Sequence, residues 1–364
     1  MSFSGKPVTV QRTSLLSDIS RINFQEETRQ FTVGPFRLNY AAGFVIVGPA
    51  LLGVVSWKIG FQNILDHLSL IGWSFLPVIC ISALWKANNT LAFFLVFPSR
   101  EGLSYWRLFV VNLAGDVVNS SLPLANLGGE LAKPILLRSE LPFSISMSAV
   151  VANKTVEILS GLIFTLICVC LSFVFVDLQG HIRMAIVTAT LIGSLAIFLL
   201  CRVQRQGLFS IILGMLQYIP FMGSVLRSNK DILIRADRSL MDLYAHSKVR
   251  CLAAFVSRSI SWLLGIVETY LILNLMQLDP TLLQASLLVA LPLMMDTALF
   301  FVPAGIGTME TGHSYVSYLL GLSAGAGLSL GLLKRVRRLF WMGLGIALLS
   351  ARVLQYRTSP IEPE

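Results

Sequence analysis

Charged residues are scarce in this chain of 364 residues. Lys, Arg, Asp and Glu together make up 13% of it, whereas a soluble globular domain carries about 25%. Hydrophobic residues make up 55%, and the mean hydropathy is +0.75. This lack of charge excludes a soluble protein. Apolar stretches of about 20 residues, long enough to cross a hydrocarbon core, repeat along the chain, and they predict an all-α, polytopic integral membrane protein.

Cysteine and histidine are also few, with five and four residues. The cysteines form no CxxC pair and the histidines do not cluster, so we expect no metal site and no cofactor. The chain has no P-loop of the G-x-x-x-x-G-K-[ST] type, so ATP-driven movement is not expected. The net charge of +9 lies in basic residues beside apolar stretches, where such residues set membrane topology. We therefore expect no nucleic-acid partner.

Eight apolar stretches predict about eight transmembrane helices in a domain that covers residues 41–351. The first 40 residues are a polar tail without the apolar core of a signal peptide, and 352–364 form a C-terminal tail. The predicted stretches are 41–57, 68–97, 103–122, 144–176, 183–201, 251–276, 281–302 and 324–351.

An insert at 202–250, between the fifth and sixth stretches, is rich in Arg and Lys and is therefore predicted to be cytoplasmic. Apolar residues recur within it at helical spacing, which predicts an amphipathic helix that lies on the membrane surface. The residues at this spacing are Leu233, Ala236, Leu240 and Leu243.

Two stretches 180 residues apart carry the same sparse polar residues, and they predict two repeat halves at about 103–176 and 283–351. Many transporters consist of two such repeats, with the substrate site between them. Counting spans from the cytoplasmic insert gives a parallel repeat in which 124–143 and 304–323 are broken or re-entrant segments. The repeated residues are Asp116, Pro123, Glu130 and Lys154 in the first half, and Asp296, Pro303, Glu310 and Lys334 in the second.

Each half places a carboxylate seven residues after a proline, with two glycines between them. Proline breaks a helix and glycine lets a ligand or another backbone approach closely, and free amides at a helix start bind anions. Alternatively, the carboxylates only stabilise a helix N-terminus. The predicted site residues of this kind are Gly129 and Glu130 in the first half, and Gly305, Gly307 and Glu310 in the second.

Basic residues in the apolar stretches are candidates for binding an anionic headgroup. Lys154 lies three residues from Glu157, so the two either pair with each other or serve a ligand. Four cations follow in the second half, and at least some of them should meet phosphates, water or carboxylates such as Glu310. These four cations are Lys334, Arg335, Arg337 and Arg338.

Two further ionisable residues are candidates for proton coupling. Glu268 has no cation within a helical turn, so it either pairs across helices, is protonated or lines a cavity. His313 could share a proton with Glu310, or could make a structural hydrogen bond.

Glycines at small-residue spacing predict close helix packing in the second half. These glycines are Gly321, Gly325, Gly327 and Gly331.

The segment from Asn112 to Glu157, with the sequence PAGIGTMETG at 303–312 and the basic helix after it, resembles the lysylphosphatidylglycerol synthase transmembrane family of flippase-like proteins. The resemblance runs from about residue 42 onward. It implies a translocase-like membrane domain. The chain ends at Glu364, so the family's aminoacyl-transfer domain and lysyl transfer are not expected. The residues that the resemblance carries over are Pro123, Gly129 and Glu130, and Pro303, Gly305, Gly307 and Glu310.

We therefore expect a lipid translocase of the bacterial inner membrane rather than an enzyme. Its substrate would be the headgroup of an anionic phospholipid, a glycolipid, a polyprenyl-linked lipid or a hopanoid-type lipid, and lipid-synthesis enzymes are candidate partners. Two alternatives stay open. One is a membrane-embedded enzyme that acts on a lipid-linked substrate, and the other is a non-transporting partner of a lipid-synthesis complex.

Overall fold

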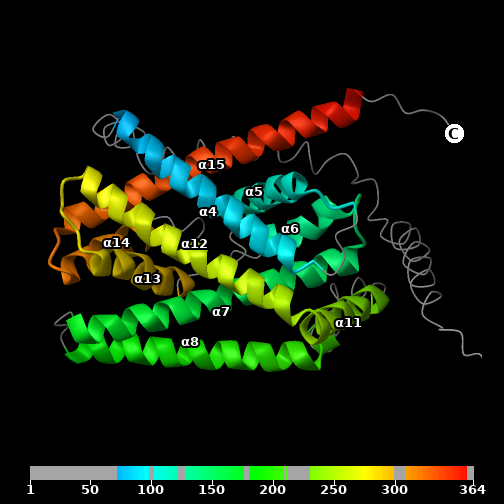
Figure 1. The fold of residues 1–364 in the computed structure, drawn as a ribbon, viewed down its shortest axis with the longest axis horizontal. Helices are drawn as coiled ribbons and strands as arrows, with labels where there is room; N and C mark the ends of the chain where they lie inside the picture. The colour runs from blue at the N-terminus through cyan, green and yellow to red at the C-terminus, as the bar shows by residue number, and fades with distance from the viewer. Residues whose placement is uncertain are drawn as a thin grey trace, which may run out of the picture.

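The computed structural model describes residues 72–97, 102–121, 128–175, 180–208, 210–211, 230–298 and 308–358 (Figure 1). Every regular element in these residues is helical, so the prediction of an all-α protein is confirmed. The predicted stretch 41–57 and the C-terminal end of the chain lie outside the described residues. The helices are η1 (Gly72–Phe75), α4 (Leu76–Leu95), α5 (Tyr105–Ser121), α6 (Gly128–Leu137), α7 (Phe143–Phe175), α8 (Gly180–Gln206), α11 (Lys230–His246), α12 (Lys248–Leu275), α13 (Leu282–Ala298), α14 (Thr308–Leu319) and α15 (Ala324–Thr358).

Three helical segments of the described chain are long and apolar enough to cross a membrane: Gly72–Leu95, Phe143–Phe173 and Lys248–Leu275. They coincide with three of the stretches predicted from the sequence, and they support an integral membrane protein. Helices α5 and α13 have 17 residues each, about 26 Å of helix, which is slightly shorter than a hydrocarbon core of about 30 Å. The number of eight spans stays a prediction.

The buried apolar residues form two clusters at opposite ends of the molecule. The first end cluster includes Phe93 of α4, Val150 of α7 and Ala254 of α12, and it also holds the buried face of α11. The second end cluster includes Val78 of α4 and Ile272 of α12, near the opposite ends of the same helices. Helices α7 and α12 therefore run from the first end cluster to the second, and α4 runs the other way (Figure 1).

Two short helix pairs enter the molecule from these opposite ends. Leu108 of α5 and Leu137 of α6 both lie in the first end cluster, so the open end of the α5–α6 pair lies there. Leu288 of α13 and Leu320, just after α14, both lie in the second end cluster, so the α13–α14 pair opens at the other end. The segments that join the helices of each pair, 122–127 and 299–307, lie outside the described residues.

The placement of the two helix pairs does not agree with the parallel orientation expected from the span count. The count treated 103–122 as a full span, but α5 begins at the end of the molecule where α6 finishes and α7 begins. Helices α6 and α14 have 10 and 12 residues, or about 15 and 18 Å, so neither can cross a membrane alone. This geometry agrees with broken or re-entrant segments in both halves.

The helix lengths in the two predicted halves follow the same series. Helices α5, α6 and α7 have 17, 10 and 33 residues, and α13, α14 and α15 have 17, 12 and 35. The internal repeat itself stays a prediction, which this parallel series supports. Since the two pairs open at opposite ends, such a repeat would be inverted.

Helix α11 forms where the insert was predicted to be helical. Its residues Ala236, Leu240 and Leu243 are buried, and the last two lie in the first end cluster with residues of α7 and α12. Asp237 on the same helix accepts hydrogen bonds from the backbone N–H and the hydroxyl of Ser210, at 2.9 and 2.6 Å. The apolar face of α11 is therefore used for packing within the protein.

Close packing by glycine is confirmed at two of the four predicted positions. Gly327 of α15 lies directly against the backbone of His313 in α14, and a Cβ atom at Gly331 would be 3.1 Å from the Cα of Glu310. Gly321 has a φ of +77° and lies in the turn after α14, and Gly325 makes only a loose contact. Two glycines thus allow α15 to approach the helix that carries Glu310.

Candidate functional site

Glu130 lies in the first turn of α6, where a carboxylate favours the helix dipole. Lys133 donates to both of its carboxylate oxygens, at 3.0 and 2.9 Å, and both side chains are buried. The turn is held against α5 because Gly129 N donates to Asn119 Oδ1 at 2.6 Å, and a Cβ atom at Gly129 would overlap the carbonyl of Gly115. The glycine of this motif therefore positions the carboxylate next to α5.

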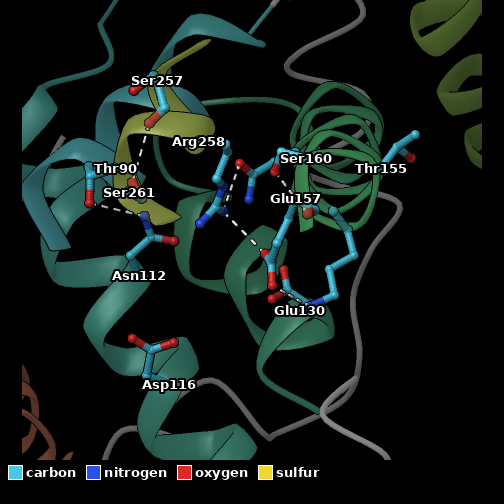
Figure 2. A network of polar contacts seen from close by, with 12 residues as sticks. Thr90, Asn112, Asp116, Glu130, Thr155, Glu157, Ser160, Ser257, Arg258 and Ser261 are labelled. Atoms are coloured by element: carbon cyan, nitrogen blue, oxygen red, sulfur yellow. Dashed lines mark hydrogen bonds and ion pairs between the residues drawn. The ribbon is translucent and has the colours of Figure 1, made fainter. Parts of the chain in front are cut away.

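Glu157 of α7 is bound by two cations from different helices. Lys154 Nζ lies 2.9 Å from Oε1, and Arg258 Nη2 of α12 lies 3.2 Å from Oε2. The predicted pairing of Lys154 with Glu157 is confirmed. Arg258 Nη2 also donates to Asn153 Oδ1 at 3.2 Å, so α7 and α12 are joined by polar contacts at this level (Figure 2).

These residues form one group, which we call the α6–α7–α12 cluster. Lys154 interacts electrostatically with Glu130 as well as with Glu157, and Glu157 also interacts with Lys133. Figure 2 shows Glu130, Glu157 and Arg258 directed toward the same region. The cluster consists of Glu130, Lys133, Lys154, Glu157 and Arg258.

Uncharged polar residues fix the position of α12 beside Arg258. Asn88 of α4 donates to Ser261 Oγ at 2.9 Å and also to the backbone carbonyl of Ser257, and it accepts from Ser257 Oγ at 2.9 Å. Asn112 of α5 donates to Thr90 Oγ1 at 3.1 Å on the neighbouring helix (Figure 2). These contacts connect α4 with both α5 and α12.

A second group of charges joins α4, α5, α12 and α15. Lys86 pairs with Asp116, and Arg337 pairs with Glu268, whose side chain is 2% exposed. Both cations lie over the ring of Trp85, at 5.0 Å for Lys86 Nζ and 5.7 Å for Arg337 Cζ. Of the three states that the sequence leaves open for Glu268, the structure contains the ion pair across helices.

Glu310 occupies in α14 the place that Glu130 occupies in α6. It lies in the first turn of the short helix, and Arg335 Nη2 donates to its Oε2 at 2.9 Å. The expectation that one of the four cations meets Glu310 is therefore confirmed. His313 Nδ1 lies 2.7 Å from the backbone oxygen of Met309, which is a structural hydrogen bond. Proton coupling through His313 or Glu268 stays a prediction.

Some predicted site residues cannot be placed. Pro123, Pro303, Gly305 and Gly307 lie outside the described residues, and so does the side chain of Asp296, although its helix is described. Sequence reasoning missed Lys86, Lys133 and Arg258 as site residues. The signal was present, because each is an ionisable residue in or beside an apolar stretch, where such residues usually have a functional partner.

The charged residues gathered in the described helices are mostly basic. In the part of the chain that the structure describes, His, Cys, Asp and Glu form no group that could hold a metal. Taken together, the two groups of charges and the basic helix after Glu310 contain eight basic residues and five carboxylates. The basic residues are Lys86, Lys133, Lys154, Arg258, Lys334, Arg335, Arg337 and Arg338, and the carboxylates described with them are Asp116, Glu130, Glu157, Glu268 and Glu310.

Comparison with known proteins places most of the chain in one family. The family described as Lysylphosphatidylglycerol synthase TM region matches residues 40–346, which include the first predicted half, the second as far as residue 346 and all the contacts above. Neither a curated protein nor a solved structure matches the chain.

Proposed function

The chain belongs to the lysylphosphatidylglycerol synthase transmembrane family, and we propose that it is a lipid translocase, which moves the headgroup of an anionic lipid between the two leaflets. The observation that carries this proposal is the placement of Glu130 and Glu310. Each lies in the first turn of a short helix, each is buried and each is bound by a cation. The two helix pairs that hold them open at opposite ends of the molecule.

This arrangement offers one headgroup site to each leaflet. A phosphate that replaces the carboxylate leaves the cation compensated. The displaced carboxylate would have to bind a proton or another cation, because an uncompensated buried charge is strongly unfavourable. Lys133 beside Glu130 and Arg335 beside Glu310 would serve as the two phosphate partners. Asp116 would line the polar path between them, together with the basic residues Lys154, Lys334, Arg337 and Arg338.

The substrate would be an anionic phospholipid, a glycolipid, a polyprenyl-linked lipid or a hopanoid-type lipid. The protein would act in a bacterial inner membrane, with lipid-synthesis enzymes as partners. Movement would follow the lipid gradient or be coupled to an ion. In the second case, Glu268 and His313 are the candidates for carrying the proton.

The test is a translocation assay with purified protein in lipid vesicles. A fluorescent phosphatidylglycerol is placed in both leaflets, and a membrane-impermeant reductant removes the fluorescence of the outer leaflet. We expect wild-type protein to expose the inner pool. Glu130→Gln or Glu310→Gln should slow this by at least about tenfold, because the cation of the pair then has no carboxylate to return to when the phosphate leaves, a loss of one hydrogen bond between charged groups.

Glu140→Gln is the matched control for this assay. Glu140 pairs with Arg107 at the open end of the α5–α6 pair and belongs to neither group of charges. This control should keep the wild-type rate. Wild-type rates in both site variants would remove Glu130 and Glu310 from the mechanism. A wild-type rate no higher than in protein-free vesicles would favour the alternative of a non-transporting partner protein.

A further inference from the structure

We propose that Arg258, Lys154 and Asn153 form a phosphodiester subsite for the lipid headgroup, and that Glu157 occupies this subsite until the headgroup displaces it. The inference rests on the proposed translocase function and specifies its substrate class as a lipid whose headgroup is joined through a singly charged phosphodiester. It depends on residues of α7 and α12, outside both short helix pairs.

Unused hydrogen-bond donors provide the first argument. Arg258 Nε and Asn153 Nδ2 are both inaccessible to solvent and have no hydrogen-bond partner in the structure. Both residues are more than nine-tenths buried, and a buried donor without a partner is costly. Nε and Nη2 lie on the same edge of a guanidinium group, and this edge binds an oxyanion with two parallel hydrogen bonds. At Arg258, Nη2 already donates hydrogen bonds to Asn153 and Glu157, and Nε donates none in the structure.

The charge of the cluster provides the second argument. The α6–α7–α12 cluster has the cations Lys133, Lys154 and Arg258 against the carboxylates Glu130 and Glu157. A phosphodiester carries one negative charge, as does the Glu157 carboxylate that it would replace, so the exchange leaves the net charge of the cluster unchanged. A diphosphate carries a larger negative charge and would change the net charge of the cluster.

The exposure of the side chains shows where a headgroup would enter. The side chains of Lys154 and Glu157 are 30% and 31% exposed, whereas that of Arg258 is 10% exposed. Lys154 and Glu157 therefore form the accessible rim, and Arg258 lies behind them. When the Glu157 carboxylate moves aside, it frees Lys154 Nζ and Arg258 Nη2 together, and these two groups then face the incoming phosphate from two helices.

Binding to purified protein in detergent micelles tests this subsite directly. Isothermal titration calorimetry would compare dioctanoyl phosphatidylglycerol with dioctanoylglycerol, which lacks the phosphate, and with glycerophosphoglycerol, which lacks the acyl chains. We expect wild-type protein to bind phosphatidylglycerol at least about tenfold more tightly than either of the others. Dioctanoylglycerol would lose at least one hydrogen bond between charged groups, and glycerophosphoglycerol would lose the apolar contacts of the acyl chains.

Three variants and one control separate the subsite from general effects. Arg258→Lys keeps the charge but removes the two-donor edge, so affinity for phosphatidylglycerol should fall at least about tenfold, as in Lys154→Met. Glu157→Gln removes the competing carboxylate, so affinity should rise, and misfolding cannot produce this gain. Arg107→Lys changes a similarly buried Arg–Glu pair outside the cluster and should bind like wild type.

Each remaining outcome has one meaning. Wild-type affinity in both Arg258→Lys and Glu157→Gln would overturn the subsite. Equal affinity for glycerophosphoglycerol and phosphatidylglycerol would overturn the lipid assignment in favour of a soluble phosphodiester. If binding depends on Arg258 while wild-type protein moves no lipid in vesicles, the translocase proposal fails and the subsite stands. If lipid moves but binding does not depend on Arg258, only the subsite fails.

Discussion

Arg335 in α15 donates a hydrogen bond of 2.9 Å to Glu310 in the first turn of α14, and both side chains are almost fully buried. Arg335→Met would leave a buried carboxylate without its cation. We therefore expect the free energy of unfolding to fall by about 3–5 kcal/mol. Glu310→Gln combined with Arg335→Met should cost less than Arg335→Met alone, because the double variant contains no uncompensated charge at this place. Unfolding in mixed detergent micelles measures the free energy of unfolding of the wild type and of both variants.

The coupling free energy between the two side chains follows from the two single variants, Arg335→Met and Glu310→Gln, and the double variant. If the loss of stability in the double variant equals the sum of the losses in the single variants, the two side chains contribute independently and their pair does not hold α14 against α15.

Gly327 and Gly343 lie on the same helix but in different surroundings, and they form a matched pair for substitution. A Cβ atom at Gly327 would overlap the backbone of α14 and lie 2.6 Å from the Cα of Ser314, whereas a Cβ atom at Gly343 would meet nothing within 4 Å. Gly327→Ala should therefore destabilise the protein by about 1–3 kcal/mol or more. Gly343→Ala should be neutral or stabilise it by up to about 1 kcal/mol, because alanine favours a helix.

The stability of the two glycine variants is measured by thermal unfolding, with the fraction of protein that stays monodisperse in detergent as the signal. A stable Gly327→Ala protein would show that α15 can move away from α14 without loss of stability. This would contradict the close packing of α15 against the helix that carries Glu310.

Ser139 and Ser323 test the orientation of the two helix pairs. Both are exposed, Ser139 between α6 and α7 and Ser323 directly before α15. The open ends of the two pairs lie in opposite end clusters. Ser139→Cys and Ser323→Cys, each made after the five native cysteines are replaced by alanine, should therefore react with a membrane-impermeant maleimide from opposite sides of the membrane. Reaction from the same side would restore a parallel arrangement.

The sequence was sufficient for features that depend on local pattern. The apolar stretches 144–176 and 251–276 match α7 and α12 closely, since a run of this length and composition allows little but a membrane helix. The pairing of Lys154 with Glu157 also follows from helical spacing alone. The carboxylates Glu130 and Glu310 were found because the same residue spacing occurs twice.

Contacts between distant parts of the chain could not be predicted in this way. Arg258 and Glu157 are 101 residues apart, and Glu268 and Arg337 are 69 apart, so no periodicity relates them. The direction of the α5–α6 pair was also misjudged. An apolar helix of 17 residues is close enough to the membrane thickness to be read as a span, and only its packing shows that it turns back.

The opposite openings of the two helix pairs have an electrical consequence. A singly charged headgroup that enters at the α5–α6 end and leaves at the α13–α14 end would carry its charge through the full membrane potential, worth about 2.3 kcal/mol per 100 mV. At a potential of that size, the potential alone would shift the distribution of the lipid between the leaflets about fiftyfold. Under the proposed translocase function, the membrane potential would therefore act on the direction of transport together with the lipid gradient.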